Sequence, residues 1–217
     1  LWVADWVASL GGAVTALPLP PAPVIPLMCF GATLAVLCWR EGLTIRRPGL
    51  LGCGLLAGIA MLAASAAIWL TASRPLVLIA PEGEAVGLMT ASGRAVSKPS
   101  GGAFVVSTWL QEDGDMATQE ESAARPAWQG DRRDRMAALP QGWEIWHFTG
   151  KGAADRAPAA CQPKRIVVLS EKLSTRADWL CVMLDLGRLR ITGAVTVEMG
   201  DQGPVLRGVN QMLRSPG

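Results

Sequence analysis

Histidine is the side chain best suited to metal binding and to proton transfer near neutral pH, and the 217-residue sequence contains one, His147. A zinc hydrolase needs several His, Cys or carboxylate ligands at workable spacing. The sequence has no second histidine and no two cysteines separated by two residues. It therefore excludes a His-rich zinc centre, and it excludes a Ser-His-Asp triad unless His147 serves that triad. Because Trp146 and Phe148 flank His147, we expect a packed or interface residue in a strand.

The segment TGKGAAD at 149–155 is similar to a phosphate-binding loop. The Walker pattern requires a glycine five positions before Gly150 and a Ser or Thr after Lys151, and the sequence has neither. Three carboxylates further along the chain are too scattered to predict an acid–base pair: Glu171, Asp178 and Asp185. We therefore assign no catalytic residue, no cofactor and no metal ligand.

The five cysteines divide between an apolar and a polar part of the chain, with Cys161 and Cys181 in the polar part. If that part faces an oxidising periplasm, these two cysteines could form a disulfide. Such a bond would close a loop of about 20 residues and contribute about 3 kcal/mol. Two free thiols, one of them buried in a strand, are an equal alternative.

The elements that carry these residues follow from composition. The sequence is 50% hydrophobic and 18% charged, whereas an average soluble domain is about one quarter charged. Residues 1–74 hold only six charged side chains, and the other 32 lie in 75–217 as 16 basic and 16 acidic residues. This asymmetry predicts a membrane part followed by a soluble part. The balanced charge of the soluble part predicts no strong electrostatic grip on nucleic acid.

Two apolar stretches predict transmembrane helices, at about 22–39 and 50–70. The second has 21 residues without a charge and spans about 30 Å as a helix, the thickness of the hydrocarbon core. The first is at the short end of the range, and a re-entrant or interfacial segment is its alternative. Gly54 and Gly58 form a GxxxG pattern, which predicts packing against other helices.

Charges around the two stretches predict their orientation. Arg40, Arg46 and Arg47 lie in the connection at 40–49, and the positive-inside rule places this loop in the cytoplasm. Both ends of the segment, and the soluble domain at 75–217, are then periplasmic. Trp39 and Trp69 fit interfacial anchors at opposite faces of the bilayer.

Residues 1–21 predict a short amphipathic helix and a proline-rich link. Trp2, Trp6 and Leu10 line one side of this helix, which could lie in the outer membrane interface or end an upstream helix. The sequence begins at Leu1 with no basic region ahead of a short apolar run, which disfavours a signal peptide. We expect the C-terminal part of a longer protein.

Short apolar runs with turn residues between them predict an α+β fold for 75–217. We expect an exposed polar connection over 111–142, a loop over 150–160 and a helix over 171–180. A hairpin is expected from 193–198 and 205–209. The other expected strands are 76–80, 85–90, 104–110, 143–148, 166–170 and 181–185.

Taken in order, these segments resemble the end of ComEC-type DNA-internalisation proteins. The resemblance rests on WVASLGGAVTALPLPPAPVIPLMCFGATLAVLCW, a second span ending in WLTASRP, then LVLIAPEGEAVGLMTASGRAV, FVVSTWL, DGD, RIVVLS and CVMLDLGRLRITGAVTVE. It covers nearly the whole chain. It implies the last membrane helices of the family followed by a shortened metallo-β-lactamase-like domain.

The family implies an inner-membrane channel that passes single-stranded DNA into the cytoplasm in natural competence. Members with an intact lactamase-like domain carry an HxHxDH-type metal motif, which this sequence lacks. We therefore expect a catalytically degenerate periplasmic domain. Its expected partners are the lipid bilayer, the remaining channel helices, single-stranded DNA and other DNA-uptake proteins. The alternatives are a membrane-anchored hydrolase or nuclease, and a membrane-anchored periplasmic interaction or sensor domain.

Overall fold

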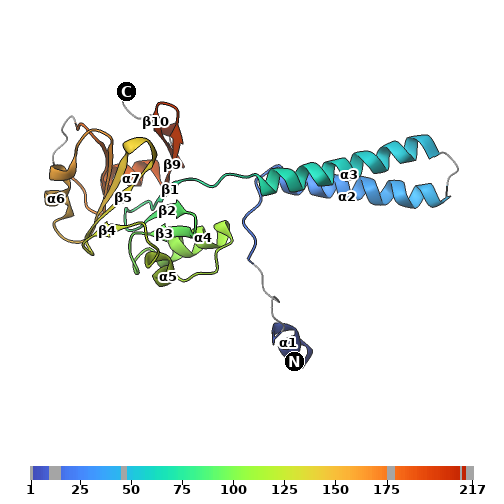
Figure 1. Cartoon of the computed structure of the whole chain (residues 1–217), viewed down its shortest axis with the longest axis horizontal. Coiled ribbons are helices and arrows are strands. Elements are labelled where there is room, and N and C mark those ends of the chain that lie inside the picture. Colours follow the sequence, from blue (N-terminus) through green and yellow to red (C-terminus); the bar gives the residue numbers. More distant parts are fainter. Residues whose placement is uncertain (1, 10–15, 45–47, 175–178, 211, 214–217) are drawn as a thin grey trace. The chain divides into compact units, whose positions relative to one another are not determined.

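A computed structural model describes the chain except for residues 1, 10–15, 45–47, 175–178, 211 and 214–217 (Figure 1). The chain divides into two compact units. One unit contains residues 19–73, and the other contains 74–217 together with the chain up to Pro18. The boundary after Ser73 is one residue from the expected boundary between the apolar and the soluble part.

Two long helices form the unit of residues 19–73: α2, Val24–Thr44, and α3, Pro48–Leu70. They pack against each other as a hairpin (Figure 1). Both helices occupy much of the expected loop at 40–49, so the described chain corrects the bounds of that loop. The reason is that Arg40 and Glu41 end the apolar stretch without ending the helix, since both residue types favour helix.

The predicted helix near the start of the chain is present as α1, Trp2–Ser9. Trp2 is 78% exposed and Trp6 is 54% exposed, so both indoles are open to a partner surface. Leu10, the third residue expected on this side, lies outside the described residues.

Two β-sheets form the second unit in the described part of the chain. The first sheet has the order β11-β10-β9-β1-β2-β3, and every neighbouring pair is antiparallel. Its strands are β1 Val77–Ile79, β2 Val86–Thr90, β3 Gly93–Val96, β9 Val195–Gly200, β10 Gly203–Gly208 and β11 Met212–Leu213. The second sheet has the order β4-β5-β6-β7-β8, with parallel pairing from β6 to β8. Its strands are β4 Gln129–Gly130, β5 Asp134–Ala138, β6 Glu144–Phe148, β7 Arg165–Leu169 and β8 Val182–Leu184.

The two sheets pack face to face around one apolar core. Val77 and Ile79 of the first sheet and Ile145, Ile166 and Val168 of the second are fully buried in this core. Alternate residues of the same strands point outward, because side chains alternate between the two faces of a strand. The outward residues form two further apolar clusters.

Helices cover both outer faces of this sandwich. Helix α4, Ala103–Asp113, packs Val106, Trp109 and Leu110 on the first sheet, and α5, Gln119–Ala123, lies beside it against β3 (Figure 1). Helix α6, Ala153–Ala160, covers β6 and β7 of the second sheet. A fourth helix, α7, Leu186–Thr192, buries Leu189 in the central core. The described layers are therefore helix, sheet, sheet and helix.

Several expected elements are correct. Strands at 76–80, 85–90, 143–148, 166–170 and 181–185 correspond to β1, β2, β6, β7 and β8, and the expected hairpin is β9–β10.

The strand expected at 104–110 is wrong, because this segment is helix α4. Val105, Val106, Trp109 and Leu110 repeat at helical spacing and bury one face. The β-branched and aromatic side chains favoured a strand, but packing on the sheet decides the structure.

Three further expectations are corrected. The exposed connection at 111–142 contains α5, β4 and β5, and the loop at 150–160 contains α6. The helix expected at 171–180 is absent from its described residues, 171–174 and 179–180. In the first two segments a few side chains pack on the sheets, although the segment carries too little apolar periodicity to show it.

Candidate functional site

A cavity of the α+β unit lies at one end of the sandwich. Its volume is about 890 Å³, and it is lined by residues 98–100, 131–134, Thr149, Gly150 and Arg156. These residues follow β3, connect β4 with β5, follow β6 and lie on α6. Since β6 and β7 are parallel, this end is the carboxyl edge of the parallel strands, where α/β sheets commonly bind ligands.

The lining is rich in positive charge. Arg156 Nε donates to both carboxylate oxygens of Asp134 at 3.0 Å, so these two charges neutralise each other. Lys98, Arg132 and Arg133 make no side-chain hydrogen bond or ion pair within the described residues. Asp131 is the remaining acidic residue of the lining, which leaves a net charge of about +2 at the cavity.

His147 lies in β6 with its side chain on the inner face of the sandwich, fully buried. Nδ1 is 2.7 Å from Ser97 Oγ, and Nε2 is 2.9 Å from the Gly83 carbonyl oxygen. Burial lowers the pKa of His147 to about 4, so the ring is neutral at pH 7. With both nitrogens engaged, His147 is the packed strand residue that the sequence predicts.

The TGKGAAD segment does not offer its amides to a ligand. The Glu171 carboxylate accepts from the backbone N–H of Gly152 at 3.1 Å and of Ala154 at 3.0 Å, at the start of α6. These hydrogen bonds, that of Ala154 first, hold the pKa of Glu171 below its usual value. The carboxylate thus occupies the place of a phosphate at a helix N-terminus.

The other two carboxylates do not complete an acid–base pair. Asp185 caps α7, accepting from the Arg188 N–H at 2.9 Å, and also accepts from the Leu173 N–H at 3.0 Å. Asp178 lies outside the described residues. Within the described chain, no group of three or more His, Cys, Asp or Glu side chains is arranged to hold a metal ion.

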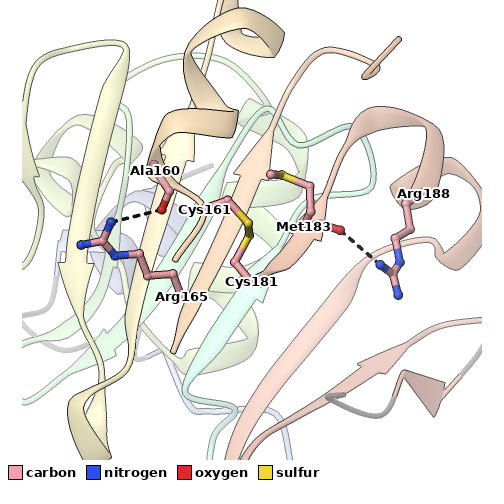
Figure 2. Close-up of a disulfide and its surroundings, with 6 residues drawn as sticks. All are labelled: Ala160, Cys161, Arg165, Cys181, Met183 and Arg188. Atoms are coloured by element: carbon pink, nitrogen blue, oxygen red, sulfur yellow. Dashed lines mark hydrogen bonds between the residues drawn. A yellow bond between two sulfur atoms is a disulfide. The ribbon is translucent and has the colours of Figure 1, made fainter. Parts of the chain in front are cut away.

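Cys161 and Cys181 form a disulfide in the structure, with Cα atoms 5.2 Å apart (Figure 2). The bond joins the residue after α6 to the residue before β8. Arg165 donates to the Ala160 carbonyl at the end of α6, and Arg188 donates to the Met183 carbonyl of β8 (Figure 2). The disulfide joins the end of α6 to β8, Arg165 of β7 holds the end of α6, and Arg188 of α7 holds β8.

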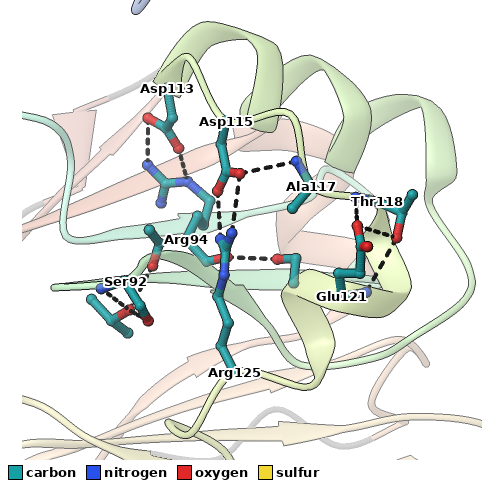
Figure 3. A network of polar contacts seen from close by, with 11 residues as sticks. Ser92, Arg94, Asp113, Asp115, Ala117, Thr118, Glu121 and Arg125 are labelled. Atoms are coloured by element: carbon teal, nitrogen blue, oxygen red, sulfur yellow. Dashed lines mark hydrogen bonds and ion pairs between the residues drawn. The ribbon is translucent and has the colours of Figure 1, made fainter. Parts of the chain in front are cut away.

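A second polar cluster, which the sequence did not reveal, lies against β3 (Figure 3). Arg94 is fully buried and pairs through Nε and Nη2 with the Asp113 carboxylate. Arg125 pairs with Asp115, and this pairing lowers the pKa of Asp115. Arg125 and Ser122 also donate to the Arg94 carbonyl, so they cover the free edge of β3.

The Arg94 cluster also contacts both segments that lead to the helical hairpin. The Arg94 guanidinium donates to the Pro75 carbonyl. Gly114, with φ 72°, follows Asp113, and a Cβ there would lie 2.6 Å from Pro18 N and 2.9 Å from Leu17 C. Only glycine permits this approach of the backbone at 17–18.

The glycines of the GxxxG pattern pack within the hairpin itself. A Cβ on Gly58 would lie 2.8 Å from Gly31 O and from Ala35 N of α2. A Cβ on Gly54 would clash with Cys38 of α2. The contact that we expected with other helices is thus one between α3 and α2.

One described helix is long and apolar enough to cross a membrane, over Gly52–Leu70 of α3, and 11% of that segment is buried. The apolar part of α2, Val24–Trp39, is shorter. Large apolar side chains such as Phe30, Val36 and Leu56 stay exposed on the hairpin.

The residues expected to set orientation are only partly described. Arg40 lies within α2, whereas Arg46 and Arg47 lie outside the described residues. Trp39 is 65% exposed near the connected end of the hairpin, and Trp69 is half-buried near its open end. These two indoles lie at opposite ends of the hairpin, as anchors at two interfaces require.

The cationic residues of the cavity were missed by sequence reasoning. The charge block at 131–135 gave a signal, but alternating charges are typical of a solvated face, and Lys98 and Arg156 lie far from it in the sequence.

Comparisons of the chain with protein-family models, curated proteins and solved structures found no match.

Proposed function

We propose that the chain is the C-terminal part of a ComEC-type inner-membrane channel for uptake of single-stranded DNA, with a catalytically degenerate periplasmic domain. The observation that carries the proposal is the order of the architecture. A packed helical hairpin leads directly into a sandwich with helices on both outer faces. This order supports the resemblance in sequence, which implies the last membrane helices followed by a shortened metallo-β-lactamase-like domain.

The chemistry of the described side chains favours a non-catalytic domain. His147 is buried with both ring nitrogens hydrogen-bonded, and Glu171 and Asp185 are held by backbone amides. Each of these groups stabilises the fold, whereas a hydrolase would expose such a group to its substrate. The basic cavity supplies positive charge that can hold an anion.

Two features support an inner-membrane location with the domain in the periplasm. The segment Gly52–Leu70 is apolar and exposed, as a membrane helix requires. The Cys161–Cys181 disulfide fits an oxidising compartment.

The test is natural transformation in the host that carries the gene. Disruption of the gene should lower transformation by a selectable marker at least 100-fold while leaving DNA bound at the cell surface. Restoration of the intact gene should restore transformation. Unchanged transformation in the disrupted strain would reject the proposal.

Two further measurements test the topology and the lack of catalysis. Alkaline phosphatase fused after residue 217 should be active, and a stable but inactive fusion would place the domain in the cytoplasm. The purified chain should cleave neither single- nor double-stranded DNA with added Zn²⁺, Mn²⁺ or Mg²⁺. Metal-dependent cleavage would favour the nuclease alternative.

A further inference from the structure

We propose that the basic cavity at the end of the sandwich binds the phosphodiester backbone of single-stranded DNA. The choice of DNA rests on the proposed function, whereas the site itself rests on the cavity. Three cations line it without a partner among the described residues, Lys98 after β3 and Arg132 and Arg133 between β4 and β5. They come from segments more than 30 positions apart in sequence, and the fold brings them to one concave surface.

The surrounding contacts keep these cations available. Asp134 would otherwise compete for them, but its carboxylate is held by Arg156. Arg156 is fixed in turn by donating to the carbonyls of Thr149 and Lys151. Asp131 offsets one positive charge. The cavity therefore keeps a net charge of about +2, which attracts anions.

The shape and lining favour a phosphodiester chain over smaller or more apolar ligands. A volume of about 890 Å³ is larger than one phosphate ion needs and is in the range of sites for extended ligands. Among the described residues of the lining, Pro99 is the only apolar one, so the cavity offers no cluster of apolar side chains to the acyl chains of a lipid. No aromatic residue is among the described residues that line the cavity, so recognition falls on the phosphates and not on stacked bases.

This mode of binding has a salt signature. For single-stranded DNA, the logarithm of the association constant falls by about 0.7 per phosphate contact for each tenfold rise in salt. Three contacts give a slope of about −2, and affinity should fall about 20-fold between 50 and 200 mM salt. Binding should depend little on base sequence.

The test uses the full chain purified in neutral detergent and a fluorescein-labelled 20-nucleotide oligo-dT, with binding followed by anisotropy. The triple variant Lys98→Ala, Arg132→Ala and Arg133→Ala removes the cations without removing a described hydrogen bond of their side chains. The matched control, Lys172→Ala, Arg190→Ala and Arg207→Ala, removes the same charges from exposed positions outside the cavity. The cavity variant should bind the oligonucleotide at least tenfold more weakly at 50 mM salt, and its association constant should hardly change with salt. The control variant should bind within twofold of the unmodified chain.

Equal binding by the cavity variant and the unmodified chain, or equal weakening in the control, would overturn the site. Two arms separate other sources of phosphate. Saturable binding of inorganic phosphate that the cavity variant loses, with no binding of oligo-dT, would assign the cavity to free phosphate. Binding that requires phosphatidylglycerol nanodiscs, with no DNA binding in neutral detergent, would assign it to a lipid headgroup. Either result overturns the proposal.

The outcome is independent of the uptake proposal. Unchanged transformation in the disrupted strain with weakened DNA binding by the cavity variant would retain the site and reject the channel. Lost transformation with unchanged DNA binding by the cavity variant would retain the channel and reject the site.

Discussion

His147 Nδ1 lies 2.7 Å from Ser97 Oγ, and this contact joins β6 of one sheet to the end of β3 in the other. Through Nε2 the same ring also meets the Gly83 carbonyl in the β1–β2 turn. An imidazole thus bridges three segments inside the sandwich. Because it is fully buried, its neutral form is part of the folded structure.

We predict that the chain loses stability in mild acid because of His147. Its pKa is about 4 in the folded chain, against about 6.5 in the unfolded chain. As the pH falls below about 6.5, the unfolded chain takes up the proton first, so folding becomes less favourable. The free energy of unfolding should fall by about 2 kcal/mol between pH 7 and 5, measured by urea unfolding with tryptophan fluorescence.

The variant His147→Gln serves as the control, because an amide does not titrate in this range. It should be less stable at pH 7 and should lack this contribution to the pH dependence. If His147→Gln loses stability between pH 7 and 5 as steeply as the unmodified chain, another group is responsible.

The buried ion pair of Arg94 and Asp113 should be costly to break. Asp113→Leu leaves the fully buried guanidinium without its carboxylate, and we expect a loss of about 3–5 kcal/mol in urea unfolding. The double variant Arg94→Met with Asp113→Leu should lose less than the sum of the two single variants. Arg207→Met, which breaks an exposed pair with Glu198, should cost less than about 1 kcal/mol. Additive losses would show that the two charges are not coupled.

The Cys161–Cys181 bond predicts the reactivity of the five cysteines. Alkylation of the denatured chain should add three groups before reduction, at Cys29, Cys38 and Cys53, and five groups after reduction. Mass spectrometry reads both numbers. Cys161→Ser with Cys181→Ser should lower the free energy of unfolding by about 3 kcal/mol. Five alkylated cysteines in the unreduced chain would show that the bond does not form in the cell.

The hairpin offers a matched pair of glycines on one helix. Gly58→Leu places a side chain against the backbone of α2 and should destabilise the hairpin by about 1–3 kcal/mol. A Cβ on Gly52 would meet no atom within 4 Å, so Gly52→Leu should be neutral. The midpoint of unfolding by SDS, followed by circular dichroism, compares the two. Equal midpoints would contradict the packing of α3 on α2 through Gly58.

Local patterns predicted most of the strands. A turn at Asp201–Gln202 connects β9 to β10. Strands β7 and β8 are short apolar runs typical of buried parallel strands. Helix α4 was missed because its Phe, Val and Trp side chains favour a strand. The sequence did contain the opposite signal, in the helical spacing of Val106, Trp109 and Leu110 and in the glycine at 114 that ends the helix.

The candidate site could not be predicted in the same way. Lys98 and Arg132 meet at one cavity only because the two sheets stack, and no local pattern encodes that stacking. The role of Glu171 depends on amides 17 to 19 positions earlier in the chain. His147 and the disulfide cysteines were identified because rare residue types limit the possible partners.

The two segments that flank the helical hairpin both reach the Arg94 cluster. Arg94 donates to the Pro75 carbonyl and pairs with Asp113. The backbone of residues 17–18 lies against Gly114, which follows Asp113. In topological terms, residues 19–73 are an insertion into a domain that begins before them and resumes after them. Insertions with adjacent ends can be exchanged without disturbing the host fold. A short flexible linker in place of residues 19–73 should therefore leave the sandwich folded and make it soluble in water without detergent.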